Sequence, residues 1–134
     1  MDFEAALGCV GMASVSVRPG DTSVAMGIND LSVVSSTTIM SVIESACSAA
    51  IIDLLEIGET TQTAKSHLEI LTTVTVGEDL RAHARCIDVT EDILTFEAEV
   101  THSNKTIATA EVQRRLVDRV SYMARIAAER ISAE

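Results

Sequence analysis

A carboxylate stands where the sequence otherwise predicts an apolar helix face. Glu44 lies between Met40 and Cys47 in a stripe that continues to Ile51, at the spacing of one buried side of a helix. A lone anion is too costly to bury, so this group must be hydrogen-bonded, protonated or placed in a cleft. It could serve as a general base or a nucleophile. A carboxylate that reaches an exposed gap or pairs with an arginine is the plainer alternative.

A cluster of hydroxyl side chains precedes the same helix. Ser35, Ser36, Thr37 and Thr38 stand where it should begin, two turns before Glu44. The free N–H groups of a helix start can stabilise an oxyanion, and serine is also a preferred cap. Ser36 therefore has a chemical and a capping interpretation, and both stay open. Together the two features predict a site at the entrance of this helix.

Composition excludes several classes of protein. The chain has 134 residues, a net charge of −10 and only three aromatic side chains, which disfavours nucleic-acid binding. The apolar runs are shorter than a membrane helix requires, and the N-terminus lacks the basic leader of a signal peptide. Three scattered cysteines and three histidines without metal-ligand spacing predict free thiols in a reducing cytoplasm and no metal site.

Hydrophobic periodicity predicts one long helix among antiparallel strands. A second helix is expected over 118–133, where apolar residues recur at helical spacing. Short polar breaks separate the strands, as in antiparallel connections. The pattern predicts an α+β domain in which about five strands wrap the helix. The expected order is a strand over 12–18, an irregular segment over 22–37, the helix over 38–56, and strands over 60–74, 78–90, 93–102 and 105–117.

The helix entrance, VVSSTTIMSVIESAC from Val33 to Cys47, resembles that of hotdog-fold thioesterases of the fluoroacetyl-CoA thioesterase type. Shorter matches are Gly58-Glu59-Thr60, Val76-Gly77 and Val117-Asp118-Arg119, so the resemblance spans about 15–125. It implies a single hotdog domain over 1–134. It also implies a homodimer or homotetramer with sites at the subunit interface, acyl-CoA as the small-molecule partner, and no cofactor beyond the coenzyme A thioester that is the substrate.

In that family a threonine at the helix start, the helix glutamate and a histidine on the following strand form the catalytic set. The resemblance places the first two on Ser36 and Glu44, whereas the histidine position falls on Ile70. Strand alternation puts His67 on the opposite face, so it is no substitute. The same resemblance suggests substrate contacts from Ser35, Thr37, Thr38, Met40 and Ile70.

The resulting prediction is a cytoplasmic acyl-CoA thioesterase that acts on a small or medium acyl group. A hotdog protein that binds an acyl-CoA without turnover is the alternative, because Ile70 replaces the histidine. A dehydratase ranks third, since the helix has no histidine for proton abstraction. The anionic substrate requires a local basic patch, for which the candidates are Arg81, Arg85, Lys105, Arg114, Arg115 and Arg119. The alternative for each of them is that it offsets neighbouring acids on a solvated strand. Cys47 is expected in the core, and His67, His83 and His102 on solvated strand faces.

Overall fold

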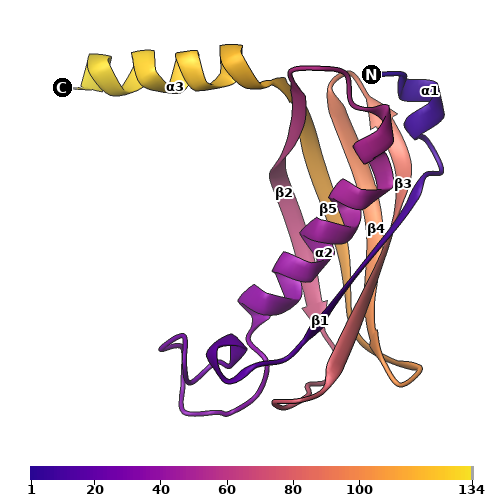
Figure 1. Cartoon of the computed structure of the whole chain (residues 1–134), viewed down its shortest axis with the longest axis vertical. Coiled ribbons are helices and arrows are strands. Elements are labelled where there is room, and N and C mark those ends of the chain that lie inside the picture. The colour runs from indigo at the N-terminus through magenta and orange to yellow at the C-terminus, as the bar shows by residue number, and fades with distance from the viewer. Residues whose placement is uncertain (134) are drawn as a thin grey trace.

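One long helix lies inside a curled antiparallel sheet (Figure 1). The computed structural model of the protein describes residues 1–133. Five strands hydrogen-bond in the order β1-β3-β4-β5-β2, which confirms the predicted α+β hotdog domain. The elements are α1 (Phe3–Ala6), β1 (Val10–Ser16), a 3-10 turn (Pro19–Asp21), α2 (Ser36–Ile51), a 3-10 turn (Ile52–Leu54), β2 (Glu59–Ile70), β3 (Asp79–Thr90), β4 (Ile93–His102), β5 (Lys105–Asp118) and α3 (Arg119–Ala133).

The boundaries of α2 differ from the prediction for a physical reason. Ser35 is the N-cap, because its side chain accepts a hydrogen bond from the Thr38 N–H at 3.0 Å. The helix therefore begins at Ser36, not near residue 38, and the capping interpretation of Ser36 is wrong. At the other end the chain tightens into a 3-10 turn at Ile52. Helix α1 was not predicted, and β2 ends at Ile70 instead of residue 74.

The core lies between α2 and the inner face of the sheet. Alternate residues of β3 and β4 are buried, so their other faces stay polar and exposed. Phe96 is the largest fully buried side chain, and aliphatic and small residues supply most of the remainder. Helix α2 contributes Ile39, Ile43, Ala46, Cys47 and Ile51.

Strand β1 approaches α2 more closely than side chains would permit. A Cβ atom on Gly11 would overlap the carbonyl oxygen of Ala46 and the backbone of Ala50. Glycine is therefore required here for space, and β1 lies directly against the helix backbone. This contact fixes the position of α2 across the sheet.

The segment Ser36–Leu54 is long and apolar enough to cross a membrane by length and composition alone. The sequence argument considered uninterrupted apolar runs, and hydroxyl side chains and Glu44 interrupt this segment. In the structure the apolar side of this segment packs into the sheet, with Ile43 and Ala46 fully buried. Burial within the domain accounts for its composition.

Candidate functional site

Glu44 lies at the border of the buried face of α2. Its side chain is 41% exposed, and its Oε2 accepts a hydrogen bond of 2.7 Å from the hydroxyl of Thr63 on β2. The Nη1 of Arg114 is 3.6 Å from the same oxygen. The plainer interpretation, an exposed gap with an arginine nearby, thus describes its surroundings. The carboxylate is nevertheless held in one position and is reachable from solvent.

Arg114 on β5 organises this corner of the sheet. The guanidinium is buried and donates to Thr61 from Nε and to Thr63 from Nη1, at 2.9 and 2.8 Å. Its Nη2 donates to the carbonyl oxygen of Thr61 at 2.9 Å. Because the Thr63 oxygen accepts from Arg114, its proton is free to point at Glu44. A chain of hydrogen bonds therefore runs from the arginine through the threonine to the carboxylate.

Sequence reasoning missed this network. It placed Arg114 in a surface patch for an anionic substrate, which is wrong because the side chain is buried and engaged by the protein. Thr61 and Thr63 were not considered at all. Their alternation fits one face of a strand, but only the register of β2 against β5 brings them to Arg114.

An open hollow of about 620 Å³ adjoins Glu44. It lies along the outward side of α2, where most of the side chains are small, and Arg114 of β5 also lines it. Such a hollow is open enough in the single chain to admit a ligand. The other lining residues are Ser41, Ser45, Ser48, Ala49, Ile52 and Gln62.

The predicted hydroxyls at the helix entrance divide into two groups. Ser35 and Thr38 are buried, and the Thr38 hydroxyl donates to the carbonyl of Asp21 at 3.2 Å. Ser36 and Thr37 are exposed at the first turn. Thr37 and Thr38 also line a second hollow, of about 360 Å³, together with Arg18 and Met26. The exposed pair is therefore available to a ligand, whereas Ser35 and Thr38 chiefly shape the turn.

Ser36 and Glu44 do not meet within one chain. They are eight residues apart on a continuous helix, which corresponds to about 12 Å along its axis. Both side chains reach solvent. Met40, between them, is half-buried and packs against the core.

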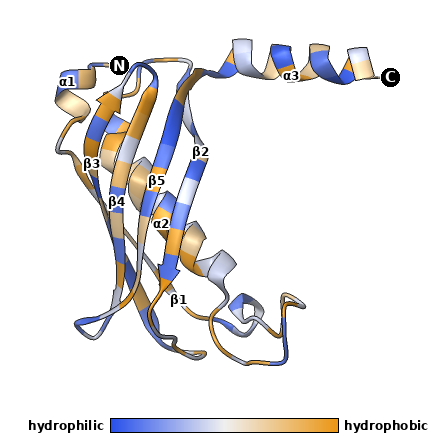
Figure 2. Cartoon of the chain, turned by 180° about the vertical axis from the view of Figure 1, so that it is seen from behind, coloured by the Kyte–Doolittle hydropathy of each residue, from blue (hydrophilic) through white to orange (hydrophobic). Residues whose placement is uncertain are grey.

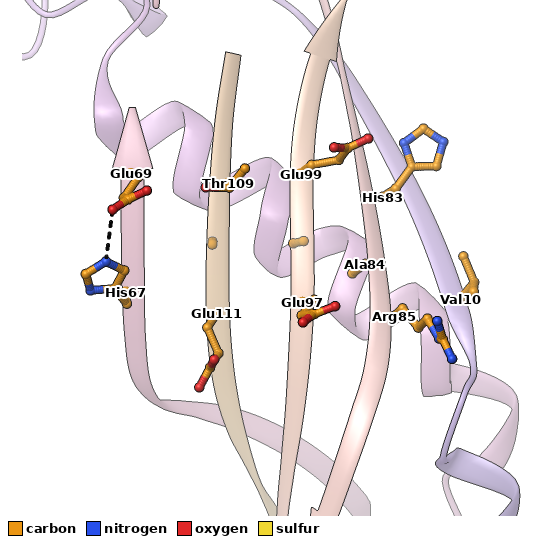
Figure 3. A pocket seen from close by; sticks show the side chains of 12 residues that line it. Val10, His67, Glu69, His83, Ala84, Arg85, Glu97, Glu99, Thr109 and Glu111 are labelled. Carbon is orange, nitrogen blue, oxygen red and sulfur yellow. Dashed lines mark ion pairs between the residues drawn. The ribbon is translucent and has the colours of Figure 1, made fainter. Parts of the chain in front are cut away.

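The face assignment of β2 agrees with the alternation argument. Ile70 pairs with Ala108 and is 45% exposed, while His67 pairs with Glu111. A β-bulge at Ala64, between Thr63 and Lys65, shifts the alternation, so Thr63 and Ile70 both face the α2 side. His67 lies on the outer face of the sheet, among the residues that line the hollow of Figure 3.

A third hollow, of about 650 Å³, lies on that outer face (Figure 3). Glutamates from three strands surround it, and Glu97 stands directly opposite Glu111. His83 and Arg85 are also present, so His83 does lie on a polar face. It is less solvated than expected, because its side chain is half-buried and its Nδ1 is buried without a hydrogen-bond partner among the described residues. An anionic ligand is poorly suited to this surface because the glutamates would repel it. The other acidic residues of the hollow are Glu69 and Glu99.

The expected basic patch is dispersed. Arg85 lies on the outer face, Arg115 pairs with Asp92 at 3.6 Å, and Arg119 begins α3. The cation that does line a hollow at the helix entrance is Arg18, which the sequence reasoning did not single out. Its Nε lies 3.6 Å from Asp21, but its side chain is 80% exposed and can reach a ligand.

Two other expectations concern His102 and Cys47. His102 is less solvated than expected, because its Nε2 lies 2.8 Å from Glu78 and its Nδ1 lies 2.7 Å from the carbonyl of Asp79. Cys47 is fully buried, as predicted, and burial raises the pKa of its thiol to about 12. This thiol is part of the core and offers no nucleophile at neutral pH.

Comparison with known proteins provides a family and a fold. The family model described as fluoroacetyl-CoA-specific thioesterase matches residues 17–120. Among curated proteins, no sequence matches. A structure of the fluoroacetyl-CoA thioesterase FlK has a TM-score of 0.84 and 16% identity, over 90% of this chain and 94% of that chain.

Two further structures have the same fold. A thioesterase superfamily member from Thermus thermophilus has a TM-score of 0.82 and 18% identity, and the match covers 96% of both chains. A hot-dog-like protein from Thermanaerovibrio acidaminovorans has a TM-score of 0.85 and 15% identity, over 96% of this chain and 97% of that chain.

Proposed function

Because the chain belongs to the family of fluoroacetyl-CoA-specific thioesterases, we propose that it hydrolyses the thioester of a small or medium acyl-CoA. Glu44 acts as base or nucleophile, and Ser36 assists. The observation that carries this proposal is the Glu44 carboxylate, exposed in an open hollow and held by Thr63. A variant of FlK has been solved in complex with acetyl-CoA, which supports this substrate class.

In the simplest route Glu44 takes a proton from a water molecule. The water oxygen bonds to the thioester carbon, the C–S bond breaks, and the sulfur leaves as coenzyme A thiolate. The products are a carboxylic acid and coenzyme A, and the proton returns from Glu44 to one of them or to water. A thiolate leaves without a strong acid to protonate it. An aliphatic side chain at Ile70 is therefore compatible with turnover.

Backbone N–H groups at the first turn of α2 are suited to the oxyanion. The Thr38 N–H is already bound by the Ser35 side chain, and the Ile39 N–H by the Ser35 carbonyl. Among the described residues, the N–H groups of Ser36 and Thr37 donate no hydrogen bond within the protein. These two donors, at an exposed helix start, are the ones we assign to the thioester oxygen.

A site at a subunit interface reconciles the distances. Ser36 and Glu44 are about 12 Å apart along α2, so one chain does not bring both to the same thioester. A second copy that covers the outward side of α2 would enclose the hollow beside Glu44 and bring a second helix entrance to it. The exposed Arg18 at this entrance would then meet the phosphates of coenzyme A, which a chain of charge −10 otherwise repels.

The second candidate is a protein that binds an acyl-CoA without hydrolysing it. The observation that favours it is Ile70, which fills the position of the family histidine and makes this part of the α2 side aliphatic. Binding alone requires neither the carboxylate nor the histidine.

Thiol release from acyl-CoAs of two to twelve carbons separates the two candidates. We expect turnover that falls about 100-fold or more in Glu44→Gln, the usual scale for loss of a general base. Glu69→Gln is the matched control, because this glutamate lies on the outer face of the neighbouring strand. Acyl-CoA binding by calorimetry without turnover at any chain length would favour the second candidate. Equal turnover in wild type and Glu44→Gln would refute the role of Glu44.

A further inference from the structure

The C-terminal helix α3 projects from the domain without covering any part of it. In both views it leaves the top of β5 and extends past β2, away from the sheet (Figures 1 and 2). None of its described side chains is buried. The family match ends at residue 120, whereas the matches to two of the compared structures cover 96% of this chain and therefore extend into the helix.

One side of α3 is an apolar stripe. Val120, Met123 and Ile131 are 76%, 57% and 73% exposed, and with Ala127 they recur at intervals of three or four residues. Figure 2 shows these apolar bands between polar ones along the helix. A 15-residue helix is marginal in water when its apolar side is unpacked. The stripe therefore requires a partner surface.

Charged side chains on the polar side of α3 interact with residues of the same helix. Arg125 pairs with Glu129 at 3.7 Å, and its guanidinium lies over the ring of Tyr122 at 5.2 Å. The Arg119 N–H donates to the carbonyl of Gly58, which ties the first turn to the start of β2. The direction of the helix is thus set by the domain, while its apolar stripe faces outward.

Charge distinguishes between the possible partners. Residues 1–118 contain seven Lys and Arg against eighteen Asp and Glu, a formal charge of −11, whereas α3 contains three Arg and one Glu. A cationic helix is attracted to the acidic body of another copy. An anionic membrane surface would repel the body that carries the helix. Charge complementarity therefore favours a second copy of this chain.

The open edge of the sheet indicates where the second copy approaches. Strand β2 is twelve residues long, ends the strand order and presents unpaired backbone groups at the edge that α3 passes. Identical strands that pair antiparallel invert one copy, so the Glu59 end of one β2 meets the Ile70 end of the other. The loop over residues 22–35 lies at that lower end (Figure 1). It exposes Val24, Met26, Ile28 and Leu31, beside the exposed Asp30.

We propose that α3 is an arm whose apolar stripe packs on loop 22–35 of a second copy of this chain, and receives the same contact in return. The loop ends at Ser35, immediately before the first turn of α2. Each arm would therefore cover the N-terminal end of α2 in the other copy. This inference concerns assembly and does not depend on the chemistry at Glu44.

Sedimentation velocity of the full chain over a range of concentrations tests the arm. The variant Met123→Gln/Ile131→Gln makes the stripe polar without a change of charge, and Ser121→Gln/Ser132→Gln makes a matched uncharged change on the polar side. We expect a dimer whose dissociation constant rises at least tenfold in the first variant and less than twofold in the second. Equal dissociation constants, or a monomeric wild type, would overturn the proposal. Binding of monomeric wild type to vesicles of anionic phospholipid would assign the stripe to a membrane instead.

Cross-linking between two chains of different size tests whether α3 of one copy contacts loop 22–35 of the other. In a Cys9→Ser background, one chain carries Leu31→Cys and a longer, tagged chain carries Met123→Cys. The expected result is a mixed covalent dimer on oxidation, several-fold more abundant than with Glu129→Cys on the tagged chain. A mixed dimer that is equally abundant with both chains, or absent with both, contradicts the assigned contact with loop 22–35. Thiol-release activity is measured separately, so a failure of the arm and a failure of the proposed hydrolysis are distinguishable.

Discussion

The hydroxyl of Thr63 donates to the carboxylate of Glu44 across 2.7 Å, and it accepts a hydrogen bond from Arg114 at 2.8 Å. A residue of the edge strand thus sets the position of the carboxylate on the central helix. The buried arginine in turn orients the threonine proton toward Glu44.

Replacing Thr63 with valine should make the position of the Glu44 carboxylate less fixed while the carboxylate itself is retained. The change deletes both hydrogen bonds while the shape of the side chain is retained. We expect a loss of about 1 kcal/mol in the free energy of unfolding and a several-fold fall in kcat, smaller than that of Glu44→Gln. Urea unfolding and thiol release measure the two effects. Thr60→Val, on the same strand, is the control and should leave kcat unchanged. A Thr63→Val enzyme with wild-type kcat would show that Glu44 needs no positioning.

Restoring the histidine is the second test. Ile70→His places an imidazole on the α2 side of the sheet, at a position that is already 45% exposed, so the fold should tolerate it. General acid–base groups contribute about 100-fold or more when well placed, and we expect kcat to rise by about tenfold or more. Ile70→Asn is a polar control that cannot exchange a proton near neutral pH. A similar change in both variants would mean that polarity, not proton transfer, is responsible.

Alanine substitutions of the two serines at the helix entrance should have different effects on stability and on kcat. Ser35→Ala removes the N-cap, and we expect it to cost about 1 kcal/mol of stability. Ser36→Ala removes an exposed hydroxyl and should leave stability within about 0.5 kcal/mol while it lowers kcat. Thermal unfolding and thiol release together give the comparison. If Ser36→Ala keeps full activity, the hydroxyl is dispensable, and the backbone N–H groups remain the candidates for the oxyanion site.

Gly11→Ala tests the contact between β1 and α2. The added Cβ would overlap the Ala46 carbonyl and the Ala50 backbone, which are parts of a rigid helix. Overpacking of this kind typically costs about 1–3 kcal/mol, and we expect the upper end because no flexible side chain can yield. Gly20→Ala, at a position with open space, is the control. Equal unfolding free energies for both variants would contradict the close approach.

Alkylation should distinguish the three cysteines. Burial raises the pKa of the Cys47 thiol to about 12 and also raises that of Cys86. At pH 8 only about one Cys47 thiol in 10⁴ is then ionised, so iodoacetamide should react first at the half-buried Cys9. Raising the pH toward 12 should increase the reactivity of Cys47. Peptide mass spectrometry after timed labelling gives the rates. Labelling of Cys47 at the rate of Cys9 in the folded protein would refute its burial.

Local patterns in the sequence were enough to predict the main helices and strands. They also identified Glu44 as a candidate site residue. Helical periodicity identified a carboxylate among apolar neighbours, and strand alternation placed His67 and Ile70 on opposite faces. The cap was misplaced by one residue, because four consecutive hydroxyls offer no local signal for which one begins the helix.

The network around Glu44 could not be predicted in the same way. Thr63 and Arg114 are 51 residues apart and meet through the register of two strands. That register depends on a bulge, which alternation of apolar residues does not reveal in a polar strand. The arginine therefore looked like one more surface cation.

The bulge at Ala64 also decides which side chain the helix side of β2 offers. If Ala64 paired like its neighbours, every later residue of the strand would exchange faces, and His67 would stand opposite Ala110 in place of Leu68. That arrangement would turn Lys65 and Glu69 toward the helix side and expose Leu68, at a considerable cost in solvation. A one-residue shift in the register of β2 against β5 would thus turn the imidazole of His67 toward α2. A single unpaired alanine determines whether that side presents an aliphatic wall or a group that can carry a proton.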